Sequence, residues 1–141
     1  MTVYVESSAV LAWLLDQPVG WLAFDTIRSA DHVVSSDLTL VECDRVVRRR
    51  VADGEMDAPR ADALRSELSN AAAGWNIASI GADVVARARA SYPDDRVRTL
   101  DAIHLATAVT ARSSVGDLAI VTLDDRIREN ATALGFRVLP E

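Results

Sequence analysis

Apolar residues along this chain alternate between short runs and longer stretches with helical spacing. The short runs are rich in Val and Ile, and they predict strands at Val3–Val5, His32–Ser35, Asn76–Ile80, Leu118–Thr122 and Arg137–Leu139. The stretches between them predict helices at Ser8–Leu15, Val19–Ser29, Asp37–Ala52, Ala58–Ala73, Ala82–Tyr92, Leu100–Ser113 and Asp125–Leu134. This alternation predicts a three-layer α/β/α sandwich around a mostly parallel five-stranded sheet. Because no linker or repeat interrupts the pattern, we expect residues 1–141 to form a single domain.

The composition excludes several classes of function. The net charge is −6, which excludes a strongly basic nucleic-acid surface but not a local basic patch. All 15 basic residues are Arg, so phosphate binding or Schiff-base chemistry that needs a Lys is excluded. Cys43 is the only cysteine and is expected to be a small buried apolar residue. No segment is long and apolar enough for a membrane span, so a reducing, cytoplasmic location is the default expectation.

Acidic residues stand where ligands bind in parallel sheets. Ligands there bind beyond the carboxyl ends of the strands, where the next helices begin. Glu6 directly follows the first predicted strand, Asp124 follows another strand, and Asp101 begins an Ala-rich helix. Glu42 differs because it lies inside a helix, on a largely apolar stripe. We expect these four carboxylates to converge on one rim of the sheet.

Each acid alone also has a structural explanation. An acidic residue at a helix start caps the helix and suits the positive end of its dipole, which would account for Glu6, Asp101 and Asp124. Glu42 could equally pair with Arg45 or Arg49 on the same side of its helix. The functional interpretation therefore depends on the convergence of all four acids.

A divalent cation would reconcile carboxylates that share one place. Like charges at short range repel, and without help one carboxylate would take up a proton. Oxygen ligands without Cys or paired His favour Mg²⁺ or Mn²⁺ over Zn²⁺. Such an ion lowers the pKa of bound water and can hold a phosphodiester in line for attack.

The segments that carry these acids resemble PIN-domain ribonucleases, and in particular the VapC-like toxins of bacterial toxin–antitoxin pairs. They are Val-Tyr-Val-Glu6-Ser-Ser-Ala, Leu-Thr-Leu-Val-Glu42, Thr-Leu-Asp101-Ala-Ile-His-Leu-Ala-Thr-Ala and Ile-Val-Thr-Leu-Asp124-Asp-Arg. The resemblance spans nearly the whole chain and is weakest in the middle helices.

The resemblance implies an α/β/α fold and a metal-dependent endoribonuclease with Mg²⁺ or Mn²⁺ as its cofactor. Its substrate would be RNA, often tRNA, cut to leave a 5′-phosphate and a 3′-hydroxyl. On this hypothesis the catalytic residues are Glu6, Glu42, Asp101 and Asp124. Glu6, Asp101 and Asp124 coordinate the metal directly or through water, and Glu42 coordinates through water or orients the nucleophile. A small cognate antitoxin and a homodimer are also implied.

One position departs from the family pattern. The first family carboxylate is almost always Asp, whereas this chain has Glu6, whose carboxylate lies one methylene further from the backbone. Because Mg²⁺ demands near-octahedral geometry, we expect a site that still binds metal but is attenuated. A different rotamer, a naturally weak enzyme or an altered residue would each account for Glu6.

Other polar residues near this rim have supporting roles. Ser7 and Thr122 offer hydroxyls that can hydrogen-bond a ligating carboxylate. Asp125 either joins the acidic cluster or, more simply, caps its helix. Arg45 and Arg49 are candidates for RNA phosphate contacts, with a solvated helix face as the alternative.

Two further features favour structural roles. His104 has apolar neighbours and is expected to be a hydrogen-bonded interior histidine rather than a metal ligand. Trp13, Trp21 and Phe24 favour packing over base stacking, and the resemblance places an antitoxin groove near them.

Two competing functions remain open at this point. The first is a PIN-fold binding module that assembles with an antitoxin and has lost catalysis through Glu6. The second is a different α/β enzyme with an acidic pocket, such as a phosphohydrolase or a DNA-directed nuclease. Metal-dependent RNA cleavage separates the first from the nuclease, and substrate comparison separates the second.

Overall fold

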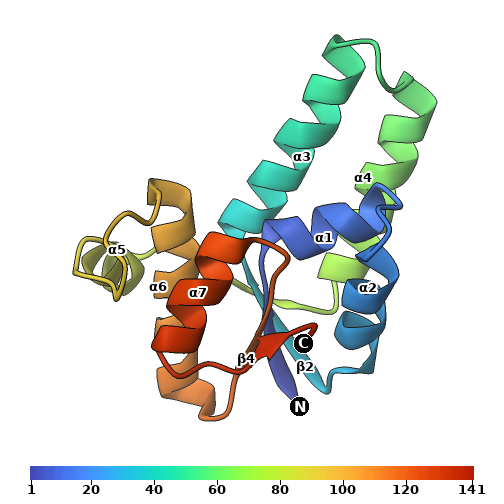
Figure 1. Cartoon of the computed structure of the whole chain (residues 1–141). Helices are drawn as coiled ribbons and strands as arrows, with labels where there is room; N and C mark the ends of the chain where they lie inside the picture. Colours follow the sequence, from blue (N-terminus) through green and yellow to red (C-terminus); the bar gives the residue numbers. More distant parts are fainter.

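The computed structural model describes residues 1–141 as a central sheet between two helical layers (Figure 1). The strands are β1 (Thr2–Val5), β2 (His32–Ser36), β3 (Asn76–Ala78), β4 (Ala119–Val121) and β5 (Val138–Leu139). The helices are α1 (Ser7–Leu14), α2 (Gly20–Ser29), α3 (Asp37–Ala52), α4 (Ala58–Ala72), α5 (Ala82–Ala88), α6 (Thr99–Val115) and α7 (Asp125–Ala133). The strand order is β3-β2-β1-β4-β5, and every pairing is parallel. The predicted α/β/α sandwich is confirmed, with a sheet that is entirely rather than mostly parallel.

Every predicted strand and helix is present, and the main differences lie at element ends. The third strand ends at Ala78 instead of Ile80, and α5 ends at Ala88 instead of Tyr92. Pro93 disfavours the helical conformation in the residue before it. The Tyr92 backbone N–H instead donates to the Asp95 carboxylate at 2.7 Å, which forms a turn before α6.

Alternating side chains of the strands fill two separate cores. Val3 and Val5 point to one face with buried residues of α1, α2, α3 and α4, including Cys43 at 0% exposure. Tyr4 and Ile120 point to the other face, against α6 and α7. This two-sided burial is the reason for the continuous apolar runs in the strands. None of the helices combines the length and hydrophobicity that a membrane crossing needs.

The carboxyl ends of all strands meet at one edge because the sheet is parallel. At this edge β1 leads into α1, β2 into α3 and β4 into α7. Figure 1 shows the first turn of α6 near the same edge, beside α7. The helix starts therefore bring residues from distant parts of the sequence together.

Candidate active site

Glu6 is buried and its carboxylate is surrounded by hydrogen-bond donors. It is 2% exposed and caps α1, with its Oε2 accepting from the Ser8 backbone N–H at 3.0 Å. Oε1 accepts from the Thr122 hydroxyl at 2.7 Å and from the Ser8 hydroxyl, and Oε2 accepts a longer bond from Ser7 at 3.4 Å. A carboxylate has about four acceptor sites, and the protein fills three of those of Glu6, while the single Ser7 hydroxyl hydrogen is shared with Glu42.

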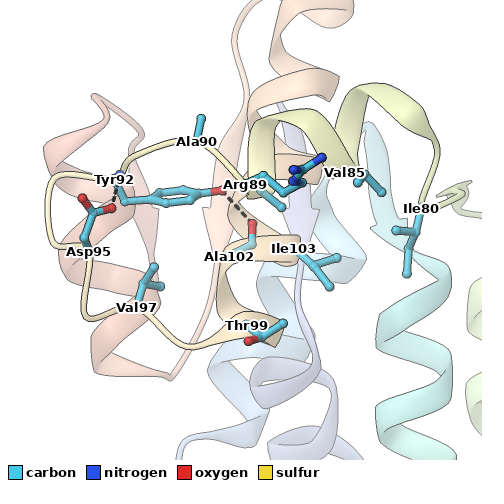
Figure 2. A pocket seen from close by; sticks show the side chains of 11 residues that line it. Ile80, Val85, Arg89, Ala90, Tyr92, Asp95, Val97, Thr99, Ala102 and Ile103 are labelled. Carbon is cyan, nitrogen blue, oxygen red and sulfur yellow. Dashed lines mark hydrogen bonds between the residues drawn. The ribbon is translucent and has the colours of Figure 1, made fainter.

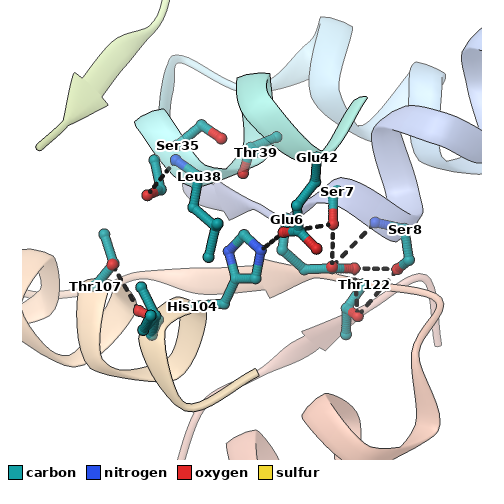
Figure 3. Close-up of polar contacts among 12 residues, drawn as sticks. Glu6, Ser7, Ser8, Ser35, Leu38, Thr39, Glu42, His104, Thr107 and Thr122 are labelled. Carbon is teal, nitrogen blue, oxygen red and sulfur yellow. Dashed lines mark hydrogen bonds and ion pairs between the residues drawn. The ribbon is translucent and has the colours of Figure 1, made fainter. Parts of the chain in front are cut away.

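The hydroxyls around Glu6 also connect β1 to the segment after β4. Ser8 Oγ accepts from the Leu123 backbone N–H at 2.8 Å, and Thr122 Oγ1 accepts from the Asp124 backbone N–H at 3.0 Å. Each hydroxyl therefore accepts from one backbone group and donates to Glu6 (Figure 3). This arrangement fixes the backbone just before Asp124.

Glu42 is held from two sides at the same edge. Its Oε1 accepts from Ser7 Oγ at 3.1 Å and lies 2.5 Å from His104 Nε2 (Figure 3). Its side chain is 25% exposed, and Oε2 has no hydrogen-bond partner within the protein. Ser7 touches both Glu6 and Glu42 and so joins the two acids.

His104 is a buried, hydrogen-bonded histidine, as the sequence predicts. Its Nδ1 lies 2.8 Å from the hydroxyl of Tyr4, whose pKa burial raises far above its usual range. An ionised Glu42 carboxylate can only accept, so Nε2 of His104 carries the ring proton and Nδ1 accepts from Tyr4. The two bonds fix the ring and, through it, the carboxylate of Glu42.

Asp101 and Asp124 lie in a different electrostatic situation. Asp124 caps α7, with Oδ1 accepting from the Ile127 backbone N–H at 3.0 Å. Asp101 lies in the first turn of α6 and accepts no hydrogen bond from the protein. Partial burial, followed by the charges of Asp124 and Glu6, raises the pKa of Asp101 above its ordinary value. His104 and Arg126 oppose this rise only in part.

The donor set agrees with a hard divalent cation in its chemistry. All the acids present oxygen, and the raised pKa of Asp101 reflects its partial burial and, second, the neighbouring negative charges of Asp124 and Glu6, which a cation would offset. However, no three His, Cys, Asp or Glu side chains are grouped closely enough to hold a metal ion. Glu6 accounts for part of this, because its carboxylate is turned toward Ser8 and Thr122.

The capping interpretation of the sequence is correct for Glu6 and Asp124, which cap helices while lying at the predicted edge. It is wrong for Asp101 and Asp125, because Arg98 and Asp124 occupy the cap positions of α6 and α7. Glu42 does not pair with Arg45 or Arg49, because His104 takes that place. Arg45 and Arg49 are both exposed on α3.

Two polar residues of this network, Ser8 and Tyr4, are not among the site residues that the sequence predicts. The position of Ser8 two residues after an acidic cap is the local signal for a bond back to that cap. Nothing local to Tyr4 indicates its contact with His104 in a distant helix.

The acids do not line the apolar cavity between α5 and α6. That cavity has a volume of about 340 Å³ and is lined in part by Tyr92, whose hydroxyl donates to the Ala102 carbonyl at 2.8 Å (Figure 2). Thr99, Ala102 and Ile103 of α6 face it. Because successive helix residues are about 100° apart, Asp101 lies on the opposite side of α6 from Thr99 and Ile103.

The parallel α/β/α sandwich and the carboxylates at the carboxyl edge of its sheet place this chain among the α/β proteins with an acidic site at that edge. Comparison with known sequences identifies the family within this class. The PIN domain family matches residues 3–133, and the chain therefore belongs to the PIN domain family. It is 34% identical over 137 residues to Ribonuclease VapC35 of Mycobacterium tuberculosis, a match that covers 97% of this chain and 85% of that protein.

Solved structures share the fold. The VapC20 toxin of Mycobacterium tuberculosis, described as cleaving the sarcin-ricin loop, superposes with a TM-score of 0.63 at 18% identity over 95% of both chains. A chain of a toxin–antitoxin complex from Klebsiella pneumoniae also gives 0.63 at 18% identity, over 98% of this chain and 96% of that one.

Proposed function

We propose that this chain is a VapC-like toxin and a Mg²⁺- or Mn²⁺-dependent endoribonuclease. One observation carries the proposal: at the carboxyl edge of the sheet, Asp101 accepts no hydrogen bond from the protein, and partial burial together with the charges of Asp124 and Glu6 raises its pKa. A carboxylate in that situation is an acceptor for a cation. The identity to a named ribonuclease over almost the whole chain supports the same reaction class.

In this proposal Asp101 and Asp124 hold the metal ion, with Glu6 contributing negative charge beside them. The bound ion would supply positive charge at the scissile phosphate and lower the pKa of water. Glu42 presents its unpartnered Oε2 to the attacking water and accepts a hydrogen bond or a proton from it. His104 and Ser7 keep Glu42 in that position through the bonds to Oε1. Thr122 and Ser8 fix the backbone before Asp124.

Glu6 is the reason to expect an attenuated enzyme. Its carboxylate accepts from Ser7, Ser8 and Thr122, and direct coordination would require some of these bonds to break. A cost of that kind weakens metal binding without abolishing it.

Cleavage by Asp101→Asn protein is the direct test. Purified protein free of antitoxin is incubated with RNA and Mn²⁺, Mg²⁺ or EDTA. The native chain should cleave only with metal, and Asp101→Asn should lower the rate at least about a hundredfold because metal catalysis contributes several kcal/mol. Asp62→Asn, an exposed substitution on α4, is the matched control and should cleave normally. Retained cleavage by folded Asp101→Asn would refute the assignment.

The alternative of a catalytically disabled module rests on the hydrogen-bonded carboxylate of Glu6. Glu6→Asp separates the two functions in the same assay. A severalfold gain over a measurable native rate supports an attenuated enzyme. Cleavage by Glu6→Asp alone supports the disabled module.

An antitoxin partner is proposed for the aromatic surface of α1 and α2. Trp13 and Phe24 have ring centroids 5.0 Å apart, and Trp21 beside them is 66% exposed. These rings border a surface hollow of about 440 Å³. Large exposed aromatic side chains of this kind mark protein interfaces. Trp21→Ala should weaken binding to a co-expressed small protein encoded immediately upstream, measured by calorimetry.

The proposed homodimer is tested separately. Light scattering of the purified chain should give twice its 15.2 kDa mass. A mass of one chain at micromolar concentration would contradict the dimer and leave the nuclease proposal intact.

A further inference from the structure

A polar cavity of about 350 Å³ lies between the loop before α6 and the outer face of α7. Arg96 and Arg98 contribute from the loop, Arg126 contributes from the first turn of α7, and Asp94 and Glu129 are its acidic members. The volume is within the usual range of ligand sites. Helices α6 and α7 lie side by side (Figure 1). The lining residues place the cavity beside the first turns of these helices.

The loop that forms one wall is held in place by a buried side chain. Asn130 of α7 is 3% exposed, and its Oδ1 accepts from the Asp94 backbone N–H at 3.0 Å. The Asp94 carboxylate in turn accepts from Arg96 Nε and Nη2, both at 3.0 Å, and from the Arg96 backbone N–H at 3.0 Å. The loop is therefore fixed to α7 and its conformation does not need to form on binding.

Arg98 and Arg126 remain free to bind an anion. Both side chains are exposed, and neither forms an ion pair or a side-chain hydrogen bond. Within the lining of the cavity, Arg96 balances the charge of Asp94, and Glu129 is the one remaining acid beside Arg98 and Arg126, so the lining carries a net positive charge. This is notable in a chain whose net charge is −6.

The cavity adjoins the acidic edge. Arg98 is the residue before α6 and lies three residues ahead of Asp101, and Arg126 follows Asp124 by two residues. Arg126 is also one of the charges that lower the pKa of Asp101. An RNA strand at the acids would therefore pass the two guanidinium groups.

We propose that Arg98 and Arg126 form a binding site for the RNA backbone, taking a phosphate next to the scissile one. The proposal rests on the nuclease function proposed above and adds a substrate subsite to it. Arginine suits this task because its planar guanidinium donates two parallel hydrogen bonds to phosphate oxygens.

RNA affinity without cleavage tests the site directly. A fluorescent single-stranded RNA of about ten nucleotides is titrated in EDTA, and anisotropy gives the dissociation constant at several salt concentrations. Arg98→Ala/Arg126→Ala should weaken binding roughly tenfold and reduce the slope of log K against log salt by about 0.7, the contribution of one neutralised phosphate on a single strand. Arg98→Lys/Arg126→Lys keeps the charge and should bind with intermediate affinity.

Arg137→Ala is the matched control for loss of charge. Arg137 precedes β5 at the opposite edge of the sheet and is paired with Glu141 at 2.9 Å. Its substitution should leave RNA affinity nearly unchanged. Native affinity in the double variant, or an equal loss in Arg137→Ala, overturns the proposal. Competition by a polyglutamate peptide as efficient as that by RNA of equal charge would assign the cavity to an acidic protein segment and also overturn it.

Cleavage assays separate failure of this site from failure of the nuclease. A dinucleotide has one phosphodiester and cannot reach a neighbouring phosphate site, so any loss of its cleavage in the double variant reports the effect of Arg126 on Asp101 alone. On longer RNA the double variant should show a KM raised roughly tenfold, with kcat changed by no more than dinucleotide cleavage is. If the native chain cleaves neither substrate with Mn²⁺, the nuclease proposal fails, whereas the anisotropy measurement still decides whether Arg98 and Arg126 bind RNA.

Discussion

The four carboxylates of the acidic edge fall into two halves, Glu6 with Glu42 and Asp101 with Asp124, which differ in how the protein balances their negative charge. Glu6 and Glu42 are enclosed by hydroxyls, a backbone N–H and an imidazole. Asp124 accepts one backbone hydrogen bond, and Asp101 accepts none. One half is thus stabilised by the protein, while the other half carries unbalanced negative charge.

This difference has a physical consequence for metal binding. Hydrogen bonds to a carboxylate stabilise its charged form, so a cation gains less by approaching Glu6 than by approaching Asp101. A cation that neutralises Asp101 also removes an unfavourable term from the folded state. Substitutions in the two halves should therefore change stability in opposite directions.

Removing the enclosed acid should cause the largest change. Glu6→Ala leaves the Ser8 N–H and the hydroxyls of Ser8 and Thr122 without their acceptor and removes the cap of α1. Unsatisfied buried donors and a lost cap should lower the free energy of unfolding by about 2–3 kcal/mol. Urea denaturation measures this value.

Glu67→Ala provides the comparison for Glu6→Ala. Glu67 is an exposed residue of α4 without a hydrogen bond, and its substitution should change stability by less than about 0.5 kcal/mol. Equal stability of Glu6→Ala and the native chain would show that Glu6 is not held as described.

The sequence predicts this edge well where the information is local. The strands and the acids that follow them are read from apolar runs and helix starts, so Glu6 and Asp124 could be placed before the fold was known. The partner of Glu42 could not, because His104 lies 62 residues away in α6 and only the packing of α6 against the sheet brings it there. The sequence offers Arg45 and Arg49 as local partners of Glu42 beside a role in the site, and the structure pairs Glu42 with His104 instead.

Substitution of Asp101, which accepts no hydrogen bond from the protein, should raise stability instead of lowering it. Because the folded state raises the pKa of Asp101, its contribution to stability is complete below the ordinary pKa of about 3.9 and is lost as the pH rises through the raised value. Asn does not ionise, so the Asp101→Asn variant does not lose this stability as the pH rises. Without metal, its melting temperature should be higher than that of the native chain at pH 7 and close to it near pH 3.5. Each kcal/mol gained should raise the melting temperature by about 2–4 °C.

The effect of Mn²⁺ on the melting temperature should also differ between the native chain and Asp101→Asn. Mn²⁺ at pH 7 should raise the melting temperature of the native chain and leave that of Asp101→Asn nearly unchanged. Asp62→Asn should behave like the native chain in both measurements. A native chain that does not respond to Mn²⁺, or a destabilised Asp101→Asn at pH 7, would contradict the assignment of unbalanced charge to Asp101.

The smallest effect is expected at Tyr4, which touches neither acid. Tyr4→Phe keeps the ring in the core but removes the donor to His104 Nδ1, so the imidazole is held only through Glu42. The free energy of unfolding should fall by about 1 kcal/mol, the usual net value of one hydrogen bond. If the ring positions Glu42, kcat for RNA cleavage should fall severalfold with KM nearly unchanged, whereas a purely structural Tyr4 would lower stability alone.

Tyr92→Phe is the control, because it removes a hydroxyl that donates to the Ala102 carbonyl in another part of the same core. It should lower stability by a similar amount without changing kcat. Equal kcat values for Tyr4→Phe and Tyr92→Phe would show that Tyr4 does not position Glu42 through His104. The positioning of the acids would then depend only on the residues that contact Glu6 and Glu42 directly.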